Sequence, residues 1–327
     1  MTGARRGPNN DIADVPGVKV GQSEDARVRT GVTVVLPDAP AIVAGDIRGG
    51  GPGTRESDLL DPSTLVDRAD AIVLAGGSSY GLGAADGVAA FLGANGRGFR
   101  LMEVPGVPPS PIVPAAILYD LANGGDKNWG ERLPYYELGL RAAGAASRRV
   151  TQGRAGAGFG ARAGAEAGGI GSVSYDAGDG LMIGAIMAVN SFGSVRAPGG
   201  KAFWAAPFEI DGEFGALGAP AAGAAHDLPA DTKLAAPRAN TTIGVVAVNA
   251  ALSQAEARRV AIMAQDGLAR AIRPVHGPTD GDVIFVLATP GAPVAGPLAL
   301  TRIGAIAADC VARAIARGVY EAARRQA

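Results

Sequence analysis

The hydrophobic pattern of the N-terminal third predicts short strands joined by tight turns. Apolar, β-branched runs bounded by Gly, Pro or Asp occupy residues 31–36, 41–44 and 70–75, and such runs are typical of strands. We expect the first two to pair with each other. A Gly-Gly-Ser-Ser-Tyr-Gly turn at residues 76–81 then leads into an alanine-rich helix over residues 82–92.

The middle of the chain mixes both kinds of pattern. Helical spacing appears near residues 113–121 and 135–146, and strand-like runs cover residues 170–175 and 181–189. Residues 191–239 have no clear period and are rich in Ala, Pro and Gly. We expect this stretch to be a long surface excursion or a linker.

A sharper pattern begins near residue 241 and predicts alternating strands and helices. Ser253 and Glu256 have the spacing of a capping box, which marks a helix start. The predicted elements are a strand at 242–248, a helix at 253–272, a strand at 283–288 and a helix at 300–323. The last 87 residues therefore form a strand, helix, strand, helix unit.

The composition is that of a globular protein without an electrostatic preference for polyanions. Of 327 residues, 47% are apolar and 19% are charged, and the formal net charge is −1. A nearly neutral chain lacks the field that holds nucleic acid or an anionic membrane. The 50 glycines exceed the usual share and predict many tight turns and close backbone approaches.

Few residues are available for disulfides or soft-metal sites. The chain has one cysteine, Cys310, and two histidines, His226 and His276, so we expect no internal disulfide, no structural zinc, no catalytic metal and no cofactor. The N-terminus lacks the apolar stretch of a secretory signal, and no apolar run approaches the length of a membrane span. We expect a soluble, cytoplasmic protein.

One candidate nucleophile is Ser79. Residues 77–81 match the G-x-S-x-G pattern between a predicted strand and helix, which is the context of a nucleophile elbow. A serine triad would need His226 or His276 as its base. A structural turn rich in Gly and Ser explains the same letters, so both interpretations stay open.

The glycine-rich segments at residues 49–53 and 153–164 do not have the spacing of phosphate loops. A Walker A loop needs Gly-Lys followed by Ser or Thr, and here Lys201 is followed by Ala202. The second segment also lacks the third glycine of a dinucleotide fingerprint. We interpret both segments as closely packed turns.

Thr241 is a second candidate nucleophile. It follows Asn240 where an irregular stretch ends and a strand begins, and most threonines there are simply good strand formers. If the bond before it were cut, however, its free α-amine could act as the base for its own hydroxyl. One residue would then supply both nucleophile and base.

Several longer motifs in one order resemble the self-processing P1 peptidase family. This family includes L-aminopeptidase/D-esterases, β-aminopeptidases and 6-aminohexanoate-oligomer hydrolases that degrade nylon oligomers. The motifs are Asp-Val-Pro-Gly-Val-Lys-Val-Gly at 14–21, Gly-Gly-Ser-Ser-Tyr-Gly-Leu at 76–82, Pro-Ala-Ala-Ile-Leu-Tyr-Asp at 114–120, Gly-Arg-Ala-Gly-Ala-Gly at 153–158, Asn-Thr-Thr-Ile-Gly-Val-Val-Ala-Val-Asn at 240–249, Gly-Leu-Ala-Arg-Ala-Ile-Arg-Pro-Val-His at 267–276 and Thr-Asp-Gly-Asp at 279–282. The resemblance covers nearly the whole chain.

The resemblance implies an α+β fold, an N-terminal-nucleophile-like four-layer αββα sandwich. It also implies one hydrolase domain that is cut between Asn240 and Thr241 into a large chain, 1–240, and a small chain, 241–327. Processed protomers would assemble as a homotetramer.

The resemblance also assigns roles in the site. Thr241 matches the nucleophile, Asn190 a residue that binds the oxyanion, and Tyr119 a tyrosine near the nucleophile. Asp280 and Asp282 match an Asp-x-Asp pair of the nylon-oligomer branch, where the aminopeptidase branch tends to carry Ser-x-Glu. Two carboxylates one residue apart could hold the ammonium of Thr241 or of a substrate, although a solvated turn has the same letters.

One departure from the family concerns a lysine. Many members carry one in or just after the glycine-rich segment, where this chain has Ala165, Glu166 and Ala167. Arg162 or Lys201 could take its place, the α-amine could work alone, or processing and turnover could be impaired.

The sequence therefore predicts a self-cleaving threonine amide hydrolase that acts on amino-terminal amides or 6-aminohexanoate oligomers, with a small peptide or oligoamide as substrate. Two alternatives stay open. One is a serine esterase that uses Ser79, and the other is an uncleaved, inactive member that binds or assembles.

Overall fold

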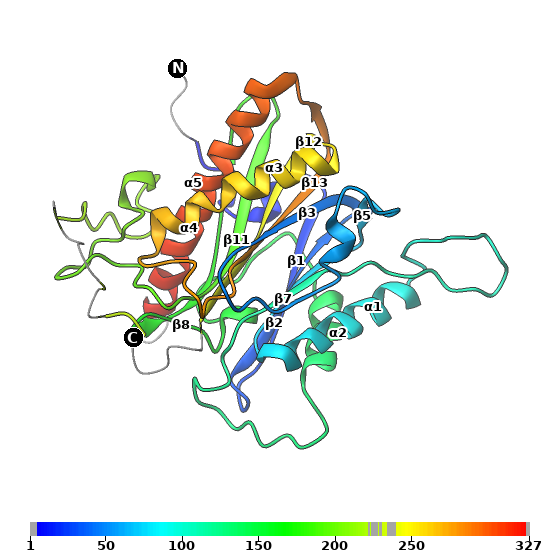
Figure 1. Cartoon of the computed structure of the whole chain (residues 1–327), viewed down its shortest axis with the longest axis horizontal. Coiled ribbons are helices and arrows are strands. Elements are labelled where there is room, and N and C mark those ends of the chain that lie inside the picture. Colours follow the sequence, from blue (N-terminus) through cyan, green and yellow to red (C-terminus); the bar gives the residue numbers. More distant parts are fainter. Residues whose placement is uncertain (1–4, 222, 224–227, 229–230, 234–239, 325–327) are drawn as a thin grey trace.

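Two β-sheets packed face to face, with helices on both outer faces, form the protein (Figure 1). The computed structural model describes residues 5–221, 223, 228, 231–233 and 240–324. The helices around residues 254–324 cover one sheet, and the helices around residues 84–144 cover the other. The order of layers is helix, sheet, sheet, helix.

The larger sheet is mixed and has six strands. Its central strands β12 and β13 run parallel, and the other neighbours are antiparallel. In sheet order the strands are β10 (Gly169–Asp176), β11 (Met182–Asn190), β12 (Thr241–Ala251), β13 (Val283–Pro293), β3 (Ala41–Ile47) and β5 (Arg68–Ala69).

The smaller sheet has five strands and is also mixed, because β6 and β7 run parallel. In sheet order the strands are β1 (Val18–Asp25), β2 (Thr30–Pro37), β6 (Ile72–Ala75), β7 (Ala115–Ile117) and β4 (Thr54–Arg55). A separate short ribbon pairs β8 (Arg162–Ala163) with β9 (Glu166–Ala167).

The helices divide between the two outer faces. α1 (Ala84–Ala94) and α2 (Tyr135–Gly144) pack on the smaller sheet, whereas α3 (Gln254–Ala264), α4 (Asp266–Ala271) and α5 (Gly296–Arg324) lie on the side of the larger sheet. Short 3₁₀ turns occur at Ile12–Asp14 (η1), Asp58–Leu60 (η2), Ser78–Gly83 (η3), Gly156–Gly158 (η4) and Ala206–Phe208 (η5). Within the described residues, no helix is long and apolar enough to cross a membrane.

Three apolar cores separate the four layers, and β12 shows how its sequence builds two of them. Val246 and Val248 pack toward α3 and α5, whereas Val245 and Ala247 pack between the sheets. Because both faces of this strand are buried, its sequence is an unbroken apolar run instead of an alternating one. The third core lies between the smaller sheet and the helices α1 and α2.

The C-terminal unit confirms its prediction, with two differences in detail. β12, α3, α4, β13 and α5 follow in the expected order. The predicted helix at 253–272 is two helices that meet at Gln265, whose buried side chain donates Nε2 to the Asp46 carbonyl at 2.8 Å. The last helix begins at Gly296, earlier than predicted.

Two predictions for the N-terminal half are wrong. The runs at 31–36 and 41–44 do not pair with each other, because β2 pairs with β1 and β6 while β3 crosses to the other sheet. The predicted helix at 113–121 is instead the strand β7, which extends the smaller sheet beside β6 and is buried. Its alanines fit the close packing between sheet and helices, which overrides their helix propensity.

The stretch 191–239 is more than a surface excursion. Phe203 and Phe214 are buried and stack edge to face, with ring centroids 5.5 Å apart. Glu213 forms a fully buried ion pair with Arg313 of α5, at 2.6 Å between Oε1 and Nε. His226 lies outside the described residues.

Candidate functional site

Three predicted site residues lie at the same end of neighbouring strands in the larger sheet. β12 and β13 are parallel, so Thr241 at the start of one lies near Asp282, which directly precedes the other. β11 runs antiparallel to β12 and ends where β12 begins, with Asn190 directly opposite Thr241. Opposed residues of such a pair project side chains to the same face at close range.

Thr241 is buried, with 3% of its surface exposed, in an uncleaved chain. Its hydroxyl is hydrogen-bonded to the carbonyl oxygen of Asn240, the carbonyl of the bond predicted to be cut. Gly281 packs against it so closely that an added Cβ would lie 2.9 Å from Thr241 Oγ1. The candidate nucleophile and the carbonyl of the bond predicted to be cut are therefore enclosed together.

Asp282 anchors the backbone beside that bond. Its Oδ1 accepts a hydrogen bond from the Thr242 amide at 2.8 Å. Its Oδ2 accepts from the His276 amide at 3.2 Å and lies 2.8 Å from the Nδ1 of the same residue. Sequence reasoning considered His276 only as a triad base, whereas the structure pairs it with Asp282.

Asp280 is a buried carboxylate with a perturbed pKa. Burial, followed by the nearby Asp282 charge, raises the pKa of Asp280 to about 6. Its Oδ2 accepts the Gly277 amide at 2.7 Å. The two carboxylates thus accept hydrogen bonds from the neighbouring amides of residues 276 and 277. They are buried and do not belong to a solvated turn.

Asn190 is held rigidly by four described contacts. Its Nδ2 donates to the Tyr119 carbonyl at 3.0 Å, and its Oδ1 accepts from the Arg162 amide at 2.9 Å, Asn123 Nδ2 at 3.2 Å and Lys233 Nζ at 3.2 Å. The contact that ties Tyr119 to the site is made by its backbone and not by its ring. Because Tyr119 follows β7, these contacts also join the two sheets.

Lys233 is the site residue that sequence reasoning missed. It is buried, with 7% of its surface exposed, whereas Lys201 is exposed and the Arg162 guanidinium turns to the Ala165 carbonyl. Neither cation considered from the sequence occupies this position. The only sequence signal was rarity, since the chain has four lysines among 30 basic residues.

The glycine-rich segments form close-packed walls. Gly49 to Gly51 lie against the loop that carries Asp280, and the Gly51 amide donates to the Asp280 carbonyl at 2.8 Å. An added Cβ on Gly49 would lie 2.4 Å from that same oxygen. In the second segment, a Cβ on Gly158 would lie 2.3 Å from the Ile170 amide nitrogen.

Among the residues that the structure describes, Ser79 has no triad partner. It is exposed on the 3₁₀ turn η3, and the described residues give it no hydrogen bond to a histidine or carboxylate. The two residues before Ser79, Gly77 and Ser78, are left-handed, with φ of 85° and 53°. The pattern at 77–81 lies on the 3₁₀ turn η3 and its N-cap residue Gly77.

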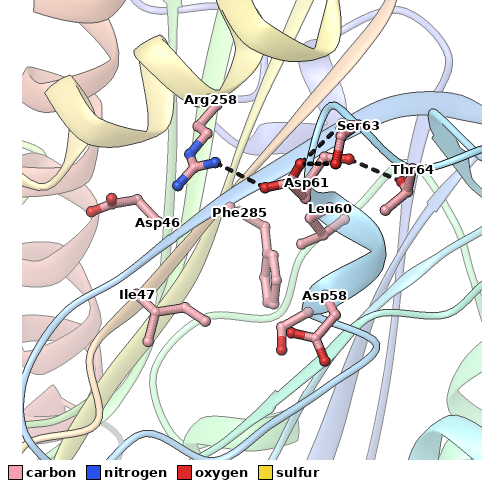
Figure 2. Close-up of a pocket in the computed structure, with 11 residues that line it drawn as sticks. Asp46, Ile47, Asp58, Leu60, Asp61, Ser63, Thr64, Arg258 and Phe285 are labelled. Atoms are coloured by element: carbon pink, nitrogen blue, oxygen red, sulfur yellow. Dashed lines mark hydrogen bonds and ion pairs between the residues drawn. The ribbon is translucent and has the colours of Figure 1, made fainter.

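A cavity of about 530 Å³ lies between β3, the 3₁₀ turn η2 and α3. Figure 2 shows Arg258 reaching toward Asp61, with Asp46, Asp58 and Phe285 on other sides of the same pocket. The Arg258–Asp61 ion pair spans 3.6 Å. The predicted site residues are not among those that line this pocket, so it is a separate feature.

The chain is similar in sequence to a known family and to several proteins of related length. Residues 10–327 match Peptidase family S58. A Mycobacterium tuberculosis protein named as an uncharacterized aminopeptidase is 46% identical over 338 residues, which cover 96% of this chain and 94% of the relative. The 6-aminohexanoate-oligomer endohydrolase of Kocuria sp. is 31% identical over 287 residues, or 84% of this chain and 74% of the relative.

The arrangement of layers also has a match among solved structures. The L-aminopeptidase D-Ala-esterase/amidase from Ochrobactrum anthropi, described as a new variant among the Ntn hydrolase fold, superposes with a TM-score of 0.70 at 20% identity. The match covers 97% of this chain and 88% of that one. It confirms the expected N-terminal-nucleophile-like αββα fold.

Proposed function

Because the chain belongs to peptidase family S58, we propose that it is a self-processing aminopeptidase or amidase whose nucleophile is Thr241. The observation that carries this proposal is the contact between the Thr241 hydroxyl and the Asn240 carbonyl at the first residue of β12. A hydroxyl so placed can attack that carbonyl in an N-to-O acyl shift. Hydrolysis of the resulting ester would leave Thr241 as a new N-terminus.

Turnover would then use the freed α-amine. With an ordinary pKa of about 7.7–8.0, this amine is partly neutral near pH 7 and can accept the hydroxyl proton. Attack on a substrate amide would give an acyl-enzyme, which water resolves. Asn190, fixed opposite the nucleophile, would help hold the oxyanion, and one such donor is typically worth about 10²–10³ in rate.

Asp280 and Asp282 support an amino-terminal substrate. Both residues are buried, with at most 3% of their surface exposed. A buried carboxylate binds an ammonium group more strongly than a solvated carboxylate does. The relative named as an aminopeptidase shares more identity with this chain than the oligomer hydrolase does, so amides of α-amino acids are the first substrate class.

Hydrolysis of 6-aminohexanoate oligomers is the second candidate. The specific observation in its favour is the Asp-x-Asp pair at 280 and 282, together with the 31% identity to a 6-aminohexanoate-oligomer endohydrolase. The ammonium of such a substrate lies five methylene groups from its carbonyl. Comparing kcat/KM for L-alanine p-nitroanilide and for the linear 6-aminohexanoate trimer would decide between the two classes.

Variants of the two candidate nucleophiles test the proposal itself. Thr241→Ala should abolish hydrolysis of both substrate classes, whereas Ser79→Ala should keep activity within a few-fold of the wild type. The opposite pattern would support the serine esterase. Absence of activity in the wild type, with an uncleaved chain, would support the binding or assembly protein.

A further inference from the structure

The first cleavage needs a base that the mature enzyme does not. In the uncleaved chain the nitrogen of Thr241 is an amide, so the α-amine that would serve during turnover does not yet exist. Some other group must accept the proton of the Thr241 hydroxyl. Titratable residues that the structure describes in these surroundings include Asp280, Asp282, His276 and Lys233.

Lys233 contacts the residue that lies opposite Thr241. Its Nζ is 3.2 Å from Asn190 Oδ1, and Asn190 is the residue directly opposite Thr241 across the β11–β12 pair. Asp280, on the other side of Thr241, is close enough to influence the Lys233 charge. Its neighbour Gly281 packs so close to Thr241 that an added Cβ would lie 2.9 Å from Oγ1. Asp280 therefore connects the surroundings of Thr241 with those of Lys233.

The backbone around Lys233 is fixed. The Lys233 amide donates to the Phe192 carbonyl at 3.0 Å, and the Asp231 carbonyl accepts from the Ala165 amide at 2.8 Å. The Asp231 carboxylate also accepts from Ser194 Oγ at 2.9 Å. These contacts hold residues 231–233 against the end of β11 and against Ala165, and the buried Lys233 amine reaches Asn190.

We propose that Lys233 is the base that starts cleavage of the Asn240–Thr241 bond. This inference rests on the proposed function, since it gives Lys233 a part in the self-processing of the same site. Proton transfer would be direct or through one water. Lys233 belongs to the segment that becomes the C-terminal end of the large chain.

The protonation state of Lys233 suits it to accept a proton. Burial, and then the Arg162 guanidinium, lower the pKa of Lys233 to about 7, while Asp280 acts in the opposite sense. A large fraction of Lys233 is therefore neutral at physiological pH and free to accept a proton. Asp282 is less suitable, because its oxygens already accept from Thr242 and His276.

The step balances as follows. Neutral Lys233 takes the Oγ1 proton as Thr241 Oγ1 bonds to the Asn240 carbonyl carbon, giving a tetrahedral oxyanion and a lysine ammonium. The oxyanion collapses, the bond from carbon to the Thr241 nitrogen breaks, and the ammonium returns its proton to that nitrogen. The product is an ester between Asn240 and Thr241 Oγ1, which water hydrolyses to a carboxylate and the free hydroxyl.

The test follows loss of the uncleaved chain. Wild type, Lys233→Ala, Lys233→Met and Lys233→Arg would be made by cell-free translation, moved to buffers from pH 5 to 9, and sampled by denaturing mass spectrometry. Lys201→Met, an exposed lysine of the same stretch, is the matched control. We expect all three Lys233 variants to cleave about 10²–10⁴ times more slowly, arginine included, because it does not deprotonate.

Chemical rescue distinguishes a base from a structural lysine. Added methylamine should restore cleavage of Lys233→Ala, with a rate that rises as the neutral fraction of the amine rises. Cleavage of Lys233→Arg or Lys233→Met within threefold of wild type would overturn the inference, and so would a slow Lys233→Ala that no amine accelerates. A wild-type chain that never cleaves would instead overturn the proposed function.

Discussion

Removing the Asp282 carboxylate should destabilise the uncleaved protein as well as stop processing. The side chain is 2% exposed and accepts the Thr242 amide at 2.8 Å, the His276 amide at 3.2 Å and the His276 ring at 2.8 Å. In Asp282→Ala all three contacts are lost, and buried donors left without acceptors destabilise by about 1–3 kcal/mol each. Allowing for relaxation and for the partly exposed His276 ring, we expect a total loss of about 3–5 kcal/mol from the three hydrogen bonds.

Asp282→Asn should fall between this variant and the wild type. Its amide oxygen can still accept from Thr242, but its NH₂ group would face the His276 amide, donor against donor. We expect a loss of about 1–3 kcal/mol. The assay is urea unfolding followed by tryptophan fluorescence, in a Thr241→Ala background so that every protein stays in one chain.

An exposed carboxylate provides the control for this series. Asp38 pairs with Lys19 at 2.8 Å, but 42% of its side chain is exposed, so Asp38→Ala should change the free energy of unfolding by about 0–1 kcal/mol. An Asp282→Ala protein within 1 kcal/mol of its background would refute the argument that this carboxylate anchors the start of β12. Processing measured in the Thr241 form should be slowed in the same order, Ala more than Asn.

Three further variants test the surroundings of the site. The pKa of Asp280 is raised from 3.8 to about 6, so the native state loses stability as pH rises from about 4 to 6. Asp280→Asn should therefore match its Thr241→Ala background at pH 4 and be more stable by at most about 3 kcal/mol at pH 8. Equal stability of the two proteins at both pH values would contradict this. Gly281→Ala places a Cβ 2.6 Å from the Gly51 carbonyl and 2.9 Å from Thr241 Oγ1, so it should slow self-cleavage at least about tenfold, whereas Gly83→Ala, with nothing within 4 Å, should cleave at the wild-type rate. Arg313→Met leaves the Glu213 carboxylate buried without its ion pair and should lower the free energy of unfolding by about 3–5 kcal/mol. Adding Glu213→Gln should recover most of that loss. Additive losses in the double variant would show that the two side chains do not act as a pair.

The part of the site on the C-terminal unit could be predicted because its signals are local. An unbroken apolar run predicted β12, and the same kind of run predicted β13 after Asp282. Once these strands are parallel neighbours, Thr241 and Asp282 must meet at one edge. The resemblance to a family supplied Asn190, which the register then places opposite Thr241.

Lys233 could not be predicted because nothing near it in the sequence determines its position. Its stretch has no helical or strand period. Contacts with Asn190 and Phe192 at the end of β11, and the contact of Asp231 with Ala165 between β8 and β9, place it. The same is true of Glu213, whose partner Arg313 is 100 residues away. Contacts between residues far apart in the sequence determine such positions, and local secondary-structure propensity does not indicate them.

The misassigned strand β7 has a related cause. Alanine-rich residues near 115–117 have high helix propensity, but their place beside β6 in a buried sheet fixes them as a strand. The parallel partner is about 40 residues earlier in the chain, so no local pattern reveals the pairing. Tyr119 reaches the site only because this strand ends beside Asn190.

The mass and N-terminal sequence of the chains in purified protein test the central claim most directly. The account predicts two chains from the wild type, residues 1–240 and 241–327 of the 327-residue sequence, with the shorter one beginning at Thr241. It predicts a single chain from Thr241→Ala. A wild-type protein that stays one 32.5 kDa chain after long incubation, or that is cut at another bond, would contradict it.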